Sequence, residues 1–155
     1  VYFSKKSREK TKELIKAQTS DVEIQNNVKE SWFDFANKAK EHADKLTNLV
    51  LSEVENKGKI VAYGASARSS TLLNFCGINS SHISVIIDKN PLKEGLLTAG
   101  SNIPIVSYDD GMESIKNSDV ILLLAWNFKD DIKRKVYKIN NKIKLIVPLP
   151  KFKVL

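Results

Sequence analysis

Residues 59–77 read KIVAYGASARSSTLLNFCG, and this stretch decides the fold. A short apolar run reaches a single glycine, Gly64, and an apolar pattern at helical spacing follows a few small residues and Arg68. This order is typical of a buried strand that turns tightly into a helix. The free amide groups that open such a helix attract anions, because the helix dipole is positive there. The stretch is therefore either a phosphate cradle or a plain turn with Ser66 as the helix cap.

The same alternation of apolar runs and helical patterns continues to the end of the chain. The expected strands are residues 59–63, 83–87, 103–106, 120–125 and 144–147. The expected helices between them are residues 67–76, 108–117 and 129–140. Strands that are apolar throughout are typical of a parallel sheet covered on both faces. We therefore predict an α/β fold, a Rossmann-like doubly wound parallel sheet of about five strands in the order 3-2-1-4-5.

The part of the chain before Gly58 has a different pattern. Residues 1–20 are mostly polar and helix-permissive, and we interpret them as a linker or helical arm from an upstream domain. Ser20 and Asp21 offer an N-cap for one amphipathic helix of roughly 30 residues that ends at Gly58. We expect one half of this helix to pack on the sheet and the other half to face a neighbouring domain, with a coiled-coil dimer as the alternative. Residues 21–155 would then form the Rossmann-like domain.

Composition limits the classes of function. Cys76 is the only cysteine and the chain has two histidines, so we expect neither an internal disulfide nor a metal site. No apolar run approaches the roughly 20 residues of a membrane span, and we expect a cytoplasmic protein without membrane contact. The chain has no initiating methionine, and we interpret it as a part of a longer protein.

Positive charge gathers near the C-terminus. The net charge is +7, and residues 129–155 carry 9 Lys or Arg against 2 Asp or Glu. Such a face can attract nucleic acid or an anionic ligand, but a solvated lysine-rich surface is the plainer interpretation. The basic run has few aromatic residues besides Tyr137 and Phe152 and matches no nucleic-acid-binding module. We therefore expect no nucleic-acid partner.

The fold itself predicts where a ligand binds. In a doubly wound sheet, ligands lie beyond the carboxyl ends of the strands, where the strand order reverses. That point lies between strands 59–63 and 120–125, and the loop after strand 83–87 borders it. The candidate ligand-binding residues are Gly64, Ala65, Ser66, Ala67, Arg68, Ser69, Thr71, Asp88, Lys89, Asn90, Trp126 and Asn127.

The residue types in the first loop suit a phosphate. Gly64 is the middle glycine of the dinucleotide-binding fingerprint, where a Cβ would obstruct the phosphate, but alanine replaces the first and third glycines. Arg68 adds a permanent charge with a fork geometry that matches phosphate oxygens. Hydroxyl donors come from Ser66, Ser69 and Thr71.

The other candidates each have two interpretations. Asp88 lies where an acid often holds a ribose hydroxyl, or it is a simple turn residue. Trp126 can stack on a base or sugar, or it closes the top of the core. Asn127 can bind sugar hydroxyls or a pyrophosphate, or it caps the next helix. The sequence contains no nucleophile–base pair and no carboxylate cluster, so we expect no catalytic residue in this chain.

Taken together, these motifs resemble one known family. The first set is Gly64-Ala65-x-Ala67-Arg68 with Thr71-Leu72-Leu73-Asn74-x-Cys76-Gly77-Ile78. The second is Asp88-x-Asn90-Pro91-x-Lys93-x-Gly95, then Gly100 and Ile103-Pro104-Ile105. The last is Leu122-Leu123-Leu124-x-Trp126-Asn127 with Pro148-x-Pro150. In this order and spacing, roughly residues 30–155 are similar to the C-terminal domain of S-adenosylmethionine-dependent C-methyltransferases that act on nucleotide-linked deoxysugars.

The resemblance implies a division of labour. A zinc-binding domain and a central domain that holds S-adenosylmethionine would precede this chain, which would hold the nucleotide-sugar. The methyl group would go to a sugar carbon made acidic by an adjacent keto group. This chain alone would then be inactive and would bind no cofactor. Ala99 and Ala125 stand where the family often has proline, and Ser69-Ser70 differs from the residues common there. The alternative function is a nicotinamide-dinucleotide module or another nucleotide-binding regulatory module.

Overall fold

The computed structural model describes residues 8–26 and 28–155. They form two compact units that divide after Glu41. The first unit is helical, and the second, residues 42–155, contains a β-sheet with the helices that cover it. The candidate ligand-binding residues all belong to the second unit.

The sheet has six strands in the order β3-β2-β1-β4-β5-β6. Their bounds are β1 Ile60–Tyr63, β2 Ile83–Ile87, β3 Ile105–Val106, β4 Val120–Leu123, β5 Lys144–Val147 and β6 Lys153–Val154. The first five strands pair in parallel, and β6 runs antiparallel to β5. The predicted order 3-2-1-4-5 is therefore confirmed, and β6 extends it by an edge strand that the sequence did not predict.

Two predicted strands are each two residues shorter than expected, and β1 is one residue shorter. The run at 103–106 pairs only at Ile105 and Val106, because the amide of Ile103 donates to the hydroxyl of Thr98 (2.9 Å). The run at 120–125 ends at Leu123. There the amides of Leu124 and Ala125 both donate to the carbonyl of Tyr63, which ends the regular ladder beside the first loop.

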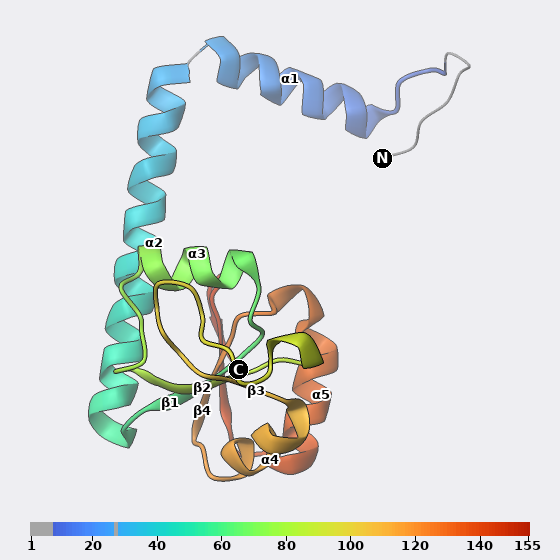
Figure 1. Ribbon diagram of the computed structural model, residues 1–155. Coiled ribbons are helices and arrows are strands. Elements are labelled where there is room, and N and C mark those ends of the chain that lie inside the picture. Colours follow the sequence, from blue (N-terminus) through green and yellow to red (C-terminus); the bar gives the residue numbers. More distant parts are fainter. Residues whose placement is uncertain (1–7, 27) are drawn as a thin grey trace. The chain divides into compact units, whose positions relative to one another are not determined.

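Helices cover both faces of the sheet, as fully apolar strands require. They are α3 Ala67–Phe75, α4 Tyr108–Lys116 and α5 Lys129–Ile139, with the C-terminal part of α2 Val28–Lys57. Leu46 of α2 and Leu73 of α3 are in one core cluster, whereas Ile115 of α4 and Val136 of α5 are in the other. Figure 1 shows α4 and α5 across the sheet from this part of α2. The predicted helices α3, α4 and α5 are confirmed, and each ends one residue earlier than expected.

The prediction of one helix that starts after Ser20 is wrong. Helix α1 spans Lys12–Asn26 and α2 begins at Val28, so Ser20 and Asp21 lie inside α1. Residues 12–19 consist largely of good helix formers, and their propensity extends the helix past the apparent cap. Part of the expected linker, residues 1–7, lies outside the described residues, as does residue 27.

The N-terminal half of α2 exposes aromatic side chains. Trp32, Phe33 and Phe35 are each more than 60% exposed, and the rings of Trp32 and Phe35 lie edge to face at 5.8 Å. The C-terminal part of the helix is packed, because Ala43, Leu46 and Val50 are buried in the core. Among the described residues, no helix is long and apolar enough to cross a membrane.

Candidate functional site

The first loop joins β1 to α3 at the point where the strand order reverses. Ser66 is the N-cap of α3, and the amide of Ser69 donates to its hydroxyl oxygen (3.2 Å). The amide of Ser66 donates in return to the hydroxyl oxygen of Ser69 (3.1 Å), so the pair forms a capping box. The interpretation of Ser66 as a cap is confirmed. Ser69 is fully buried, and its hydroxyl serves this cap rather than the surface.

Some backbone amides of this loop already have hydrogen-bond acceptors, and others are free to bind a ligand. The amide of Gly64 donates to the carbonyl of Ile87 (2.8 Å), and the amide of Ala65 donates to the Asp88 carboxylate (2.7 Å). The amides of Ala67 and Arg68, at the first two helical positions, have no acceptor among residues 8–26 and 28–155. An anion at this end of α3 would therefore meet two unpaired amides and the positive end of the helix dipole.

Asp88 connects the loop after β2 to the first loop. Its carboxylate accepts hydrogen bonds from the amides of Ala65 (2.7 Å) and Asn90 (2.9 Å). Lys93 lies 3.3 Å from the same carboxylate and also donates to the carbonyl of Ala65. Asn90 uses its side chain to accept from the amide of Leu92 (3.0 Å) and caps the short helix η1 Pro91–Lys93. Asp88 thus has the structural role of a turn residue, and a contact with a ligand would be additional to it.

A cavity of about 320 Å³ opens beside the first loop, and we call it the α5 cavity. The predicted site residues that line it are Gly64, Ala65, Ser66, Asp88 and Lys89. The rest of its wall consists of Tyr63, Ala125, Phe128, Asp131 and Ile132. Phe128, Asp131 and Ile132 were not among the predicted residues.

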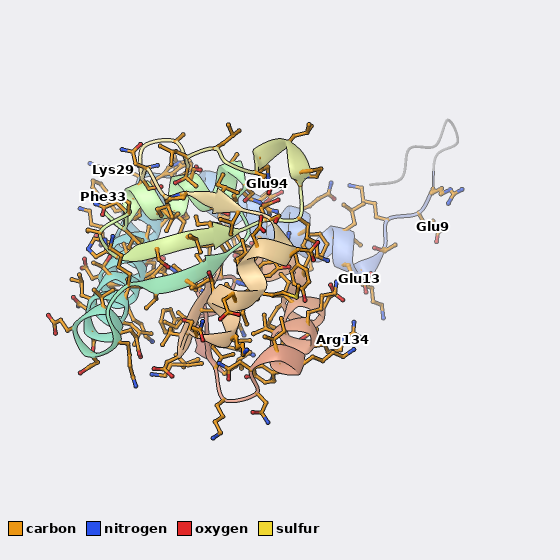
Figure 2. All side chains as sticks on the ribbon, turned by 60° about the horizontal axis from the view of Figure 1, so that its bottom comes forward. Glu9, Glu13, Lys29, Phe33, Glu94 and Arg134 are labelled. Atoms are coloured by element: carbon orange, nitrogen blue, oxygen red, sulfur yellow. The ribbon has the colours of Figure 1, made fainter. Side chains whose placement is uncertain are left out.

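The α5 cavity has carboxylates in its wall. Asp131 accepts a hydrogen bond from Lys135 (2.6 Å), which lowers the pKa of its carboxyl group and keeps it ionised. Arg134, labelled in Figure 2, lies 3.5 Å from Asp131, and Lys89 lies 3.8 Å from it. The adjacent Lys135, followed by burial, lowers the pKa of Lys89. Among the described residues, Lys89 is the only cation in the wall, and it already faces a carboxylate.

Arg68 and Trp126 lie outside the α5 cavity and line a separate groove. The guanidinium of Arg68 lies over the Trp126 ring, 5.5 Å from its centroid, in a cation–π arrangement. This Arg68 groove has a volume of about 290 Å³. It is lined by Arg68, Thr71, Leu72, Phe75, Trp126 and Leu149. Arg68 has no ion-pair partner in the described part of the chain, so its charge is available to a ligand.

A second groove adjoins Trp126 and Leu149 and is rich in lysine. It has a volume of about 270 Å³, and Lys129, Lys151 and Lys153 lie in its wall. Lys151 and Lys153 form no ion pair with any residue that the structure describes. Part of the basic C-terminal run thus gathers beside the ring on which Arg68 stacks. The net charge of residues 129–155 was the signal that could have found these lysines.

The remaining predicted residues have modest roles. Thr71 lines the Arg68 groove, but its hydroxyl donates to the carbonyl of Ala67 (3.1 Å). Asn127 is exposed in the short helix η2 Trp126–Phe128. Its alternative interpretation as the cap of the next helix is wrong, because Phe128 precedes α5 there and supplies no side-chain cap bond.

Comparison with known proteins identifies the family. Residues 1–150 match the family model described as the C-methyltransferase C-terminal domain. The chain belongs to this family. A curated relative, the C-methyltransferase NovU of Streptomyces niveus, is 33% identical over 112 residues. The match covers 71% of this chain and 26% of NovU, so the chain spans about a quarter of that relative's length.

Tyr63 is a buried group of this C-methyltransferase C-terminal domain that lacks a polar partner. The residue is 3% exposed, and its hydroxyl has no hydrogen-bond partner among the described residues. Burial, followed by the nearby Tyr108, raises the pKa of Tyr63 to about 12. A buried hydroxyl without a partner costs roughly 1–3 kcal/mol of stability. The ring of Tyr63 therefore stabilises the fold, whereas its hydroxyl does not.

Tyr63→Phe should remove a pH dependence of stability. Between about pH 10 and 12 the folded protein keeps a proton on Tyr63 that the unfolded chain has lost, so wild-type stability falls as the pH rises, by up to about 1.4 kcal/mol per pH unit. Urea unfolding at about pH 9 and 11 measures this change. We expect a smaller fall for the variant, and equal stability or better at neutral pH. An equal fall in stability in the wild type and the variant would show that Tyr63 does not cause this pH dependence.

Proposed function

We propose that this chain is the substrate-binding domain of an S-adenosylmethionine-dependent C-methyltransferase that acts on a nucleotide-linked sugar. Membership of the C-methyltransferase C-terminal domain family supports the reaction class. The sequence motifs that resemble sugar C-methyltransferases support the nucleotide-sugar. The methyl donor would be bound by an upstream domain of the same polypeptide, and this chain would hold and orient the acceptor.

The observation that carries this proposal is the arrangement at the start of α3. Arg68 carries an unpaired positive charge, and the unpaired amides of Ala67 and Arg68 open the helix beside it. Planar guanidinium groups and helix N-termini both bind phosphate oxygens well. Lys151 and Lys153, near Trp126, add further positive charge. A diphosphate held here would lie at the reversal of strand order, where ligands of doubly wound sheets bind.

The exposed aromatic residues of α2 fit the proposed upstream partner. Trp32, Phe33 and Phe35 are more than 60% exposed on one helix, and such apolar surface commonly marks a protein–protein contact. In the intact enzyme this surface would pack against the neighbouring domain. The reacting sugar carbon would then face the methyl donor held by that domain.

Arg68→Ala should weaken binding of a nucleoside diphosphate by about tenfold or more, because one charge-assisted contact is worth roughly 1.5–3 kcal/mol. Isothermal titration calorimetry of the intact protein with dTDP measures the affinity. Arg8→Ala, which removes an exposed arginine of the first unit, is the matched control and should leave the affinity unchanged. Unchanged dTDP affinity in Arg68→Ala would show that Arg68 does not contact the diphosphate. Tighter binding of NAD or NADP than of dTDP would favour the nicotinamide alternative.

A further inference from the structure

The first loop separates two recesses of different character. Ser66 lines the α5 cavity, whereas Arg68, two residues later, lines the Arg68 groove. The loop after β4 divides in the same way, because Phe128 lines the cavity and Trp126 lines the groove. No described residue lines both recesses, and only Ala67 lies between Ser66 and Arg68 along the chain. One extended ligand can therefore pass over the start of α3 and occupy both.

The two recesses differ in their charged side chains, so we expect them to bind different parts of such a ligand. The wall of the α5 cavity contains the carboxylates of Asp88 and Asp131, and its one lysine already lies 3.8 Å from Asp131. A phosphate placed there would be repelled by both carboxylates. In the part of the chain that the structure describes, the Arg68 groove is lined by an unpaired guanidinium and by no acidic residue. The anionic part of the ligand therefore belongs to the groove, and the cavity is left for an uncharged part.

The cavity wall suits a planar ring with hydrogen-bond donors. Phe128 is 66% exposed although it is a large apolar residue, and it lies in the wall together with the buried side chain of Ile132. An exposed aromatic face is a stacking surface for a nucleobase. Carboxylate oxygens accept hydrogen bonds from N–H and O–H groups, which bases and ribose carry. The volume of about 320 Å³ is in the range of small-molecule sites.

We propose that the α5 cavity binds the nucleoside end of the ligand, with the base stacked on Phe128. This inference rests on the proposed function and assigns the two ends of its substrate. A group inside the cavity is partly covered by the lining residues and is less accessible than a group outside it. The sugar carbon that accepts the methyl group must stay accessible to the donor. The unreactive nucleoside therefore occupies the cavity, and the sugar lies on the far side of the diphosphate.

The test compares Phe128→Ala with three other variants of the intact protein. Phe128→Tyr keeps the ring, Arg68→Ala removes the proposed diphosphate contact, and Leu14→Ala is a control. Leu14 is an exposed apolar residue of the first unit and has no role in the proposed site. Calorimetric titrations use dTDP, UDP, GDP and ADP to find the preferred base, and inorganic pyrophosphate as the ligand without a nucleoside.

We expect Phe128→Ala to lower the affinity for the preferred nucleoside diphosphate by about tenfold, in line with measured base–aromatic stacking. Its affinity for pyrophosphate should not change, and Phe128→Tyr and Leu14→Ala should bind like the wild type. Unchanged nucleoside diphosphate affinity in Phe128→Ala, or an equal loss for pyrophosphate, would overturn the inference. If Arg68→Ala still weakened binding in that case, the proposed function would stand. A wild-type protein that binds none of the four nucleotides would instead refute the proposed function.

Discussion

Replacing Gly64 with alanine is expected to lower the free energy of unfolding by about 4 kcal/mol. A Cβ at this position would lie 2.5 Å from the Cβ of Ala125 and 2.8 Å from its backbone nitrogen. Neither atom belongs to a flexible side chain, so β1 and β4 would have to separate where the amide of Ala125 bonds to Tyr63. The backbone of Gly64 also has a φ of +102°, which strains any residue with a side chain.

A second glycine separates these two effects. Gly95 has a φ of +75°, but a Cβ there would have no heavy atom within 4 Å. Gly95→Ala should therefore cost only the backbone strain, about 1–2 kcal/mol. Urea unfolding of both variants, followed by circular dichroism, gives the difference. If Gly64→Ala lost no more stability than Gly95→Ala, the contact with Ala125 would not be the reason for this glycine.

This contact changes the explanation for the glycine. The sequence predicted that Gly64 lacks a side chain so that a phosphate can approach. In the structure the space that a Cβ would need is occupied by Ala125, at the end of the neighbouring strand. The contact with Ala125 is a second reason for this glycine, which a fingerprint read from one segment does not show, and the approach of a phosphate stays a prediction. The diphosphate proposal now depends on Arg68 and the amides that follow the loop.

The fold was predictable wherever burial leaves a pattern in the sequence. Strands such as Val120–Leu123 are buried along their whole length, and their uninterrupted apolar runs predicted a parallel sheet. Strand β6 leaves no such pattern, since Lys153 and Val154 are both exposed on an edge. The helix boundary at Ser20 failed because serine and aspartate also occur inside helices, and only the neighbouring turns decide between cap and interior.

The rule for doubly wound sheets pointed to the loops after β1, β2 and β4, and the structure brings these loops together around the α5 cavity. That a ligand binds there stays a prediction, and the rule did not predict every residue of the cavity wall. Phe128 was missed because the third loop was considered only as far as Asn127. Asp131 was not predicted, because its approach to Lys89 depends on where α5 lies relative to the loop after β2. The separation of Arg68 from the cavity likewise depends on the tertiary structure and is not visible in the local sequence.

Lys144→Ala should lower the free energy of unfolding by about 2–3 kcal/mol, the second large effect that the structure predicts. Lys144 begins β5, and its ammonium group donates to the carboxylate of Glu53 on α2. Glu53 is 7% exposed, so removal of the lysine leaves a nearly buried carboxylate without its cation. The partial exposure of Lys144 places the expected loss below that of a fully buried pair. Chemical denaturation at neutral pH measures it.

Two further variants show whether the loss of stability comes from the unpaired carboxylate of Glu53. Lys38→Ala breaks an exposed ion pair with Asp34 and should cost less than about 0.5 kcal/mol. The double variant Glu53→Leu with Lys144→Leu removes both charges and leaves apolar side chains between α2 and β5. It should recover most of the lost stability, because two well-packed apolar residues commonly replace a buried pair without cost. A double variant as unstable as Lys144→Ala would mean that the pair fixes the helix on the sheet by its geometry, since no unpaired carboxylate would remain to explain the loss.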